Sequence, residues 1–61
     1  MSVVFQEYNE AWIGIADGGR RWRVTQCMTG WRLEFRDEGD LTSTYAGTHV
    51  SLESAMNEAT T

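Results

Sequence analysis

The chain has 61 residues with nine acidic side chains, five Arg, no Lys and one His, giving a formal net charge of −4. A chain of this length forms one small domain, here residues 1–61, and buries only about 60% of its extended surface. No apolar stretch approaches the roughly 20 residues of a membrane span. The lone Cys27 excludes an internal disulfide, and one Cys with one His, His49, supplies few ligands for a zinc cluster.

Alternation of β-branched and aromatic residues, the period of a strand, runs through most of the chain. Residues 3–10 alternate acceptably, although Val4, Tyr8 and Ala11 would equally line a helical face, and we prefer a strand because Val and Phe favour it. The following alternating segments are 11–16, 20–28, 31–37 and 41–47, with turn residues at 17–19, 28–30 and 37–40. With residues 3–10 left open between strand and helix, we predict an antiparallel sheet of three or four strands over about residues 3–47.

Residues 51–60 change to helical spacing. Leu52, Ala55, Met56 and Ala59 fall at i, i+3, i+4 and i+7, which forms one apolar stripe, and Ser51 is a good N-cap. A helix of this length is not stable alone, so it must pack on the sheet. The predicted fold class is α+β, with one C-terminal helix packed on one face of the sheet.

The strands at 20–28 and 31–37 divide their side chains between the two sides of the sheet. One side carries Trp22, Val24, Gln26, Trp31, Leu33 and Phe35, and the other carries Arg21, Arg23, Thr25, Arg32, Glu34 and Arg36. We predict a two-residue turn at Thr29 and Gly30, which joins the apolar sets under the helix. This register pairs Gln26 with Leu33, Val24 with Phe35, Thr25 with Glu34, Arg21 with Glu38, and Arg23 with Arg36.

All five Arg lie within the 17 positions from 20 to 36. Glu34 is the one acid in that segment, so its charge balance is +4, while the rest of the chain has a balance of −8. Like charges directly opposite each other, as predicted for Arg23 and Arg36, destabilise a sheet by a fraction of about 1 kcal/mol. Two interpretations stay open: the guanidinium groups splay apart in solvent and discourage aggregation, or they bind an anion.

A family pattern covers residues 20–59. The stretch "WRLEFRDEGDLTSTYAGTHVSLESAMNEA" resembles the DNA-binding domain of plant ethylene-response factors and related domains of phage and mobile-element proteins. The resemblance rests on Trp31, Glu34, Arg36 and Asp37 of a Trp-x-x-Glu-x-Arg-Asp pattern, on Tyr45, Gly47 and Thr48 before the helix, and on an Ala-rich helix. It implies a three-stranded sheet with a helix behind it, whose exposed face enters the DNA major groove. Glu34, Arg36, Tyr45, Arg21 and Arg23 would then face DNA.

Two functions therefore remain. The first is a nucleic-acid-binding module whose site residues are Arg21, Arg23, Arg32, Glu34, Arg36 and Tyr45. The second is a protein-interaction module, such as a phage-type inhibitor or adaptor, in which Arg and Trp are hot spots and the acidic remainder aids solubility or mimics nucleic acid. Charge segregation favours the first, and net charge favours the second.

Other residues support no enzyme. His49 has no Ser or Cys partner that the sequence can place beside it, and Cys27 is an incidental small residue unless a nearby guanidinium lowers its pKa. Trp12 either packs in the core or lies at an interface, because Trp22 and Trp31 already fill a small interior. We expect no cofactor, no metal and no membrane contact, a cytoplasmic location and a possible homodimer.

Overall fold

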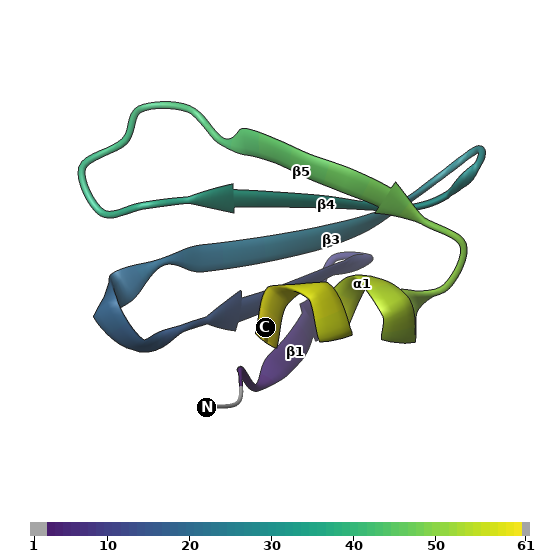
Figure 1. Cartoon of the computed structure of the whole chain (residues 1–61), viewed down its shortest axis with the longest axis horizontal. Coiled ribbons are helices and arrows are strands. Elements are labelled where there is room, and N and C mark those ends of the chain that lie inside the picture. Colours follow the sequence, from purple (N-terminus) through teal and green to yellow (C-terminus); the bar gives the residue numbers. More distant parts are fainter. Residues whose placement is uncertain (1–2, 61) are drawn as a thin grey trace.

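The computed structural model describes residues 3–60, which form a five-stranded antiparallel sheet and one α-helix (Figure 1). The strands lie in the sheet in chain order: β1 (Phe5–Tyr8), β2 (Ala11–Ile15), β3 (Arg21–Cys27), β4 (Gly30–Arg36) and β5 (Thr44–His49). A short 3-10 turn at Asp17–Gly19 joins β2 to β3, and the helix α1 spans Leu52–Thr60. The predicted α+β class, a sheet with one C-terminal helix packed on it, is confirmed.

The sheet has five strands, so the prediction of three or four is wrong. Residues 3–10 and 11–16 both contribute strands, and a two-residue turn at Asn9 and Glu10 joins β1 to β2. These residues have φ angles of 49° and 68°, which suit the tight hairpin turn whose twist matches its strands. Asn tolerates the left-handed region. Glu at the second position is unusual there, so the sequence carries no strong hairpin signal.

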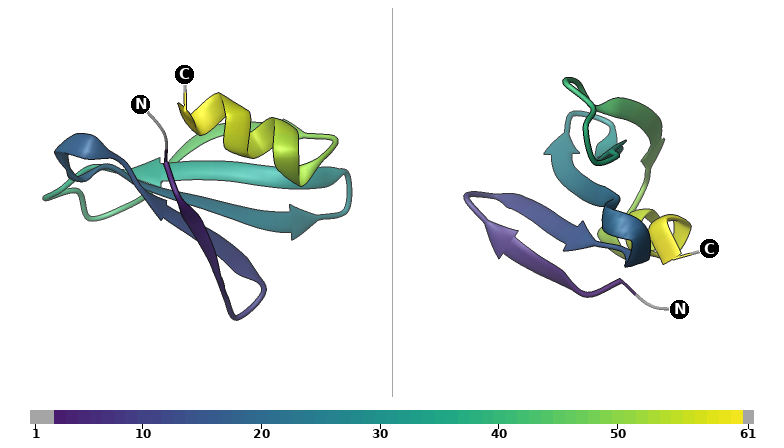
Figure 2. Two further views of the ribbon diagram at one scale, coloured as in Figure 1. Left: turned by 90° about the horizontal axis from the view of Figure 1, so that it is seen from below. Right: turned by 90° about the vertical axis from the view of Figure 1, so that its left-hand side faces the viewer.

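The helix covers one side of the sheet and leaves the other side open (Figure 2). Its buried residues Ala55 and Ala59 lie in the core cluster, which also contains Trp22, Val24 and Leu33. Val24 and Leu33 are fully buried, and each stabilises the fold by about 1.5–3 kcal/mol. The two small side chains on α1 let the helix approach the centre of the sheet closely. In a chain this small, the core is therefore concentrated on β3 and β4.

The first turn of α1 folds back over the end of β5. The Ser51 hydroxyl accepts a hydrogen bond from the Ser54 N–H at 3.1 Å, which makes Ser51 the predicted N-cap. His49 Nδ1 lies 3.0 Å from the Ser54 hydroxyl, so the expectation that His49 has no Ser partner is wrong. That contact anchors the helix start to the sheet. Within residues 3–60, no helix has the length and apolar character needed to cross a membrane.

The hairpin register between β3 and β4 differs from the prediction by two residues. The turn consists of Met28 and Thr29, because Cys27 pairs with Gly30. A shift of two keeps every side chain on its predicted side, so the division into an apolar and an Arg side holds. The pairs change: Trp22 faces Phe35, Val24 faces Leu33, Arg23 faces Glu34, and Arg21 faces Arg36. The pairing of Arg23 with Arg36 is therefore wrong, and Arg21 is the residue opposite Arg36.

The conformation of Gly30 explains why the hairpin turn consists of Met28 and Thr29 and does not include Gly30. Its φ is 144°, and a Cβ at this position would collide with the His49 carbonyl oxygen. Only a residue without a side chain lets the start of β4 come this close to the end of β5. Gly30 is thus needed inside the strand, which moves the two turn positions to Met28 and Thr29.

A bulge in β5 determines which side Tyr45 faces. Leu33 pairs with Gly47, but the next pair is Glu34 with Tyr45, so Ala46 is an extra residue. Without this extra residue, Tyr45 would be paired with Phe35 on the helix side. A bulge redirects the side chains that follow it, and here it places Tyr45 on the side opposite α1.

Candidate functional site

The side of the sheet opposite α1, which we call the open face, brings together all six predicted nucleic-acid-binding residues. Paired residues face the same way, and the ladder runs from Ile13 through Arg23 and Glu34 to Tyr45. A second row runs from Ile15 through Arg21 to Arg36, and a third places Arg32 beside Thr25 and Thr48. The open face therefore holds Arg21, Arg23, Arg32, Glu34, Arg36 and Tyr45.

One part of the open face is internally paired. An Arg32 guanidinium nitrogen lies 3.6 Å from a Glu34 carboxylate oxygen, and the Arg32 guanidinium carbon lies 5.1 Å from the centre of the Tyr45 ring. The Tyr45 hydroxyl is 2.6 Å from the Thr48 hydroxyl. These contacts orient the tyrosine, which still has 55% of its surface exposed.

The other cationic residues of the open face have no such partner. Within residues 3–60, Arg21, Arg23 and Arg36 form no ion pair. Arg21 and Arg36 are directly opposite each other, a like-charged pair that destabilises the sheet by some tenths of a kcal/mol. The four Arg and one Glu of the open face have a balance of +3, whereas the rest of the chain has a balance of −7. The open face is thus positive, although the loop acids Asp37, Glu38 and Asp40 border it beside Arg21 and Arg36.

Arg20 does not belong to this surface. Its Nε donates a hydrogen bond to one Asp37 carboxylate oxygen at 2.7 Å, and a terminal nitrogen donates to the other at 3.1 Å. Its guanidinium carbon lies 4.0 Å from the centre of the Phe35 ring, on the helix side. The hydrogen bonds from Arg20 lower the pKa of Asp37 from its ordinary value. Arg20 therefore joins the start of β3 to the end of β4, and its role is structural.

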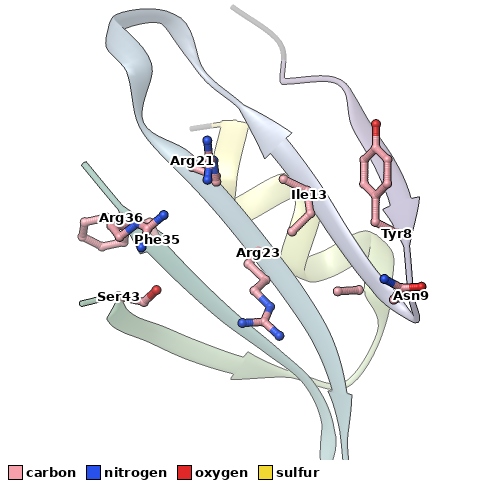
Figure 3. A pocket seen from close by; sticks show the side chains of 9 residues that line it. Tyr8, Asn9, Ile13, Arg21, Arg23, Phe35, Arg36 and Ser43 are labelled. Atoms are coloured by element: carbon pink, nitrogen blue, oxygen red, sulfur yellow. The ribbon is translucent and has the colours of Figure 1, made fainter. Parts of the chain in front are cut away.

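A hollow of about 360 Å³ lies on the open face (Figure 3). One wall comes from the β1–β2 hairpin and includes Tyr8 and Ile13. Figure 3 shows Arg21 and Arg23 between that wall and Arg36 on the other side. The complete lining is Tyr8, Asn9, Ala11, Ile13, Arg21, Arg23, Phe35, Arg36 and Ser43. The three unpaired guanidinium groups therefore surround one concavity.

Sequence reasoning missed Tyr8 and Ile13. Tyr8 is 56% exposed, and its hydroxyl donates a hydrogen bond to the Gln6 side chain at 2.6 Å. The signal was the alternation within residues 3–10 and 11–16, which puts both residues on the side that β3 fills with Arg. This alternation could place Tyr8 and Ile13 on the open face only once both segments were known to be strands of the same sheet.

Trp12 lies on the helix side, where it is partly buried and packs against the core cluster. It also lines a depression of about 480 Å³ together with Trp31, so part of its surface is accessible. The same depression is lined by Arg23 and Thr25, so an interface at Trp12 would border the open face.

Cys27 lies at the end of β3 on the same side of the sheet as Arg21 and Arg23. Its sulfur is 3.7 Å from the Thr29 hydroxyl, and that hydrogen bond is the main cause that lowers the pKa of the thiol, with Arg32 adding a weaker effect. The Arg32 guanidinium therefore lowers the pKa of Cys27 less than the Thr29 hydroxyl does.

No family model, curated protein or solved structure matches this chain. The interpretation of the site rests on its own geometry and charge.

Proposed function

We propose that this chain is a non-enzymatic nucleic-acid-binding module that uses the open face. One observation carries the proposal: Arg21, Arg23 and Arg36 surround the hollow without an acidic partner in residues 3–60. Most contacts in protein–nucleic acid complexes go to phosphate, and Arg pairs with phosphate through two parallel hydrogen bonds. A phosphate between Arg21 and Arg36 would remove the repulsion that the free sheet contains.

The rest of the open face supports the same ligand. Tyr8 and Tyr45 are exposed, and aromatic side chains stack on bases. The order β3, β4, β5, α1 is also the one that the resemblance to ethylene-response-factor domains implies. Among the strand residues that face this way, Glu34 is the one acid, so the side chains of the open face carry a charge of +3. The loop acids Asp37, Glu38 and Asp40 border the open face beside Arg21 and Arg36.

The test is fluorescence anisotropy with a labelled random oligonucleotide, as a single strand and as a duplex. Non-specific binding of about 1–100 µM near physiological salt is expected. Three phosphate contacts give a slope of log affinity against log salt of about −2 for a single strand and −2.7 for a duplex. Absence of binding to both forms at low salt would exclude the proposal.

A protein partner is the second candidate, and one observation favours it. Ile15 is 62% exposed next to Arg21 on the open face, and exposed apolar residues beside Arg are typical of protein interfaces. An acidic partner or a second copy of this chain would then occupy the same surface. Light scattering distinguishes the second copy, because a homodimer would have twice the chain mass of 6.9 kDa.

A further inference from the structure

The width of the open face does not suit a DNA groove. Five strands about 4.8 Å apart span about 19 Å, whereas the major groove is about 12 Å wide and admits a helix or a two-stranded ribbon. The β1–β2 hairpin also twists steeply across the other strands (Figure 2). An element that enters a groove must be narrow and protrude, and the open face is broad with a hollow in it.

The two walls of the hollow differ in chemistry. The β3 and β4 wall presents guanidinium groups, while the hairpin wall presents an aromatic ring and an aliphatic side chain. Its volume of about 360 Å³ is within the range of small-ligand pockets, about 300–1,000 Å³. A group with an anionic part and a flat apolar part fits such walls. In a duplex the bases are stacked and paired inside, so only an unpaired nucleotide can present its phosphate and its base together.

Exposed tyrosines stand at both edges of the sheet. Tyr8 is on β1 and Tyr45 is on β5, with Arg23 on the middle strand between them. Single-strand binding proteins combine a cationic track for the backbone with aromatic rings that stack on successive bases. The bulge at Ala46 and the contacts of Arg32 and Thr48 with Tyr45 hold one of these rings on the open face before any ligand arrives.

We propose that the ligand of the open face is a single-stranded nucleic acid rather than a duplex. This inference rests on the proposed function and specifies its ligand. The phosphates contact Arg21, Arg23 and Arg36, and the bases stack on Tyr8 at one edge of the sheet and on Tyr45 at the other. The strand crosses the β-strands instead of following a groove.

The experiment compares a labelled oligothymidylate of roughly 12 nucleotides, within the usual site size, with a duplex of the same length. Tighter binding of the single strand is expected. Tyr8→Ala and Tyr45→Ala should each weaken single-strand binding about five- to 150-fold, the loss that one base stack represents. Tyr8→Phe keeps the ring and should bind like the parent chain. Asn57→Ala changes an exposed residue on α1, which packs on the opposite side of the sheet, so this variant is the control and should also leave binding unchanged.

The outcomes separate the two proposals. Equal or tighter binding of the duplex, or unchanged single-strand binding by both Tyr→Ala variants, would overturn the single-strand inference and leave nucleic-acid binding in place. Failure of both oligonucleotides to bind would overturn the proposed function as well. If a Tyr→Ala variant melts at a lower temperature than the parent chain, the Tyr→Leu variant at the same position repeats the test with a side chain that fills space but stacks poorly.

Discussion

The like-charged pair of Arg21 and Arg36 gives the sharpest prediction. Replacing either residue with Gln removes one of three unpaired guanidinium groups around the hollow. Each phosphate contact contributes about 0.7 to the single-strand salt slope, so the slope should change from about −2 to about −1.4. The double variant should reach about −0.7. In the parent chain, affinity should fall about 15-fold between about 50 and 200 mM salt.

The same substitutions should not destabilise the fold. Arg21 and Arg36 face each other across the ladder, and relief of their repulsion contributes some tenths of a kcal/mol. For a domain of this size, 1 kcal/mol corresponds to about 4–8 °C in Tm, so a single Gln substitution should raise Tm by about 1–2 °C. Loss of binding would then accompany a gain in stability, which separates a ligand contact from a structural role.

Anisotropy titrations at several salt concentrations and thermal melts measure both quantities on the same samples. Arg20→Gln is the control, because Arg20 pairs with Asp37 on the helix side and should lower Tm without changing the slope. A slope that stays near −2 in the double variant would refute the assignment of Arg21 and Arg36 to phosphate. A fall of several degrees in Tm would refute the repulsion.

Three further predictions concern the fold. Leu33→Ala should lower the free energy of unfolding, measured by urea denaturation, by about 2–5 kcal/mol, because Leu33 is fully buried. The whole chain is expected to have a free energy of unfolding of about 3–9 kcal/mol. A loss below about 1 kcal/mol would contradict the assignment of Leu33 to the core. Gly30→Ala should destabilise more than Gly18→Ala, since both have positive φ but only Gly30 lacks room for a Cβ, and equal losses would contradict the close approach. Asp37→Asn should lower Tm at neutral pH. Because Arg20 lowers the pKa of Asp37, the difference in Tm between the parent chain and this variant should shrink as pH falls below about 4. A difference in Tm that does not change with pH would contradict the ion pair.

Part of this fold follows directly from residue patterns. Helical spacing in residues 51–60 and the N-cap at Ser51 lead to α1, and strand alternation separates the apolar and Arg sides of β3 and β4. Both signals are local, because each depends on residues within one element. These local periods account for the confirmed fold class and for the division of β3 and β4 into an apolar side and an Arg side.

The errors come from interactions between segments. A shift of two residues leaves alternation unchanged, so periodicity could not reveal that Gly30 belongs inside β4. The bulge that turns Tyr45 onto the open face depends on how β5 pairs with β4. Arg20 and Arg21 are identical in type and adjacent, yet one is bonded to Asp37 and the other lines the hollow. Only the three-dimensional pairing distinguishes a structural arginine from one that is free to bind.

The acidic remainder of the chain should limit binding only at low salt. Charges are screened over about 8 Å at physiological ionic strength and over about 30 Å at 0.01 M, and the molecule measures 30 × 25 × 21 Å. At physiological salt a phosphate on the open face is therefore governed by the nearby charges, whereas at 0.01 M it is also repelled by more distant acids such as Glu53 on α1. The plot of log affinity against log salt should flatten below about 50 mM.

A charge added on the far side tests this explanation. Asn57 is exposed on α1, and Asn57→Lys adds a positive charge near the helix C-terminus, where the dipole favours it. This variant should bind more tightly than the parent chain at about 0.01 M salt and equally at about 0.15 M, because screening removes its influence there. A uniform gain at all salt concentrations would mean that the ligand reaches α1 itself, and the binding surface would then extend beyond the open face.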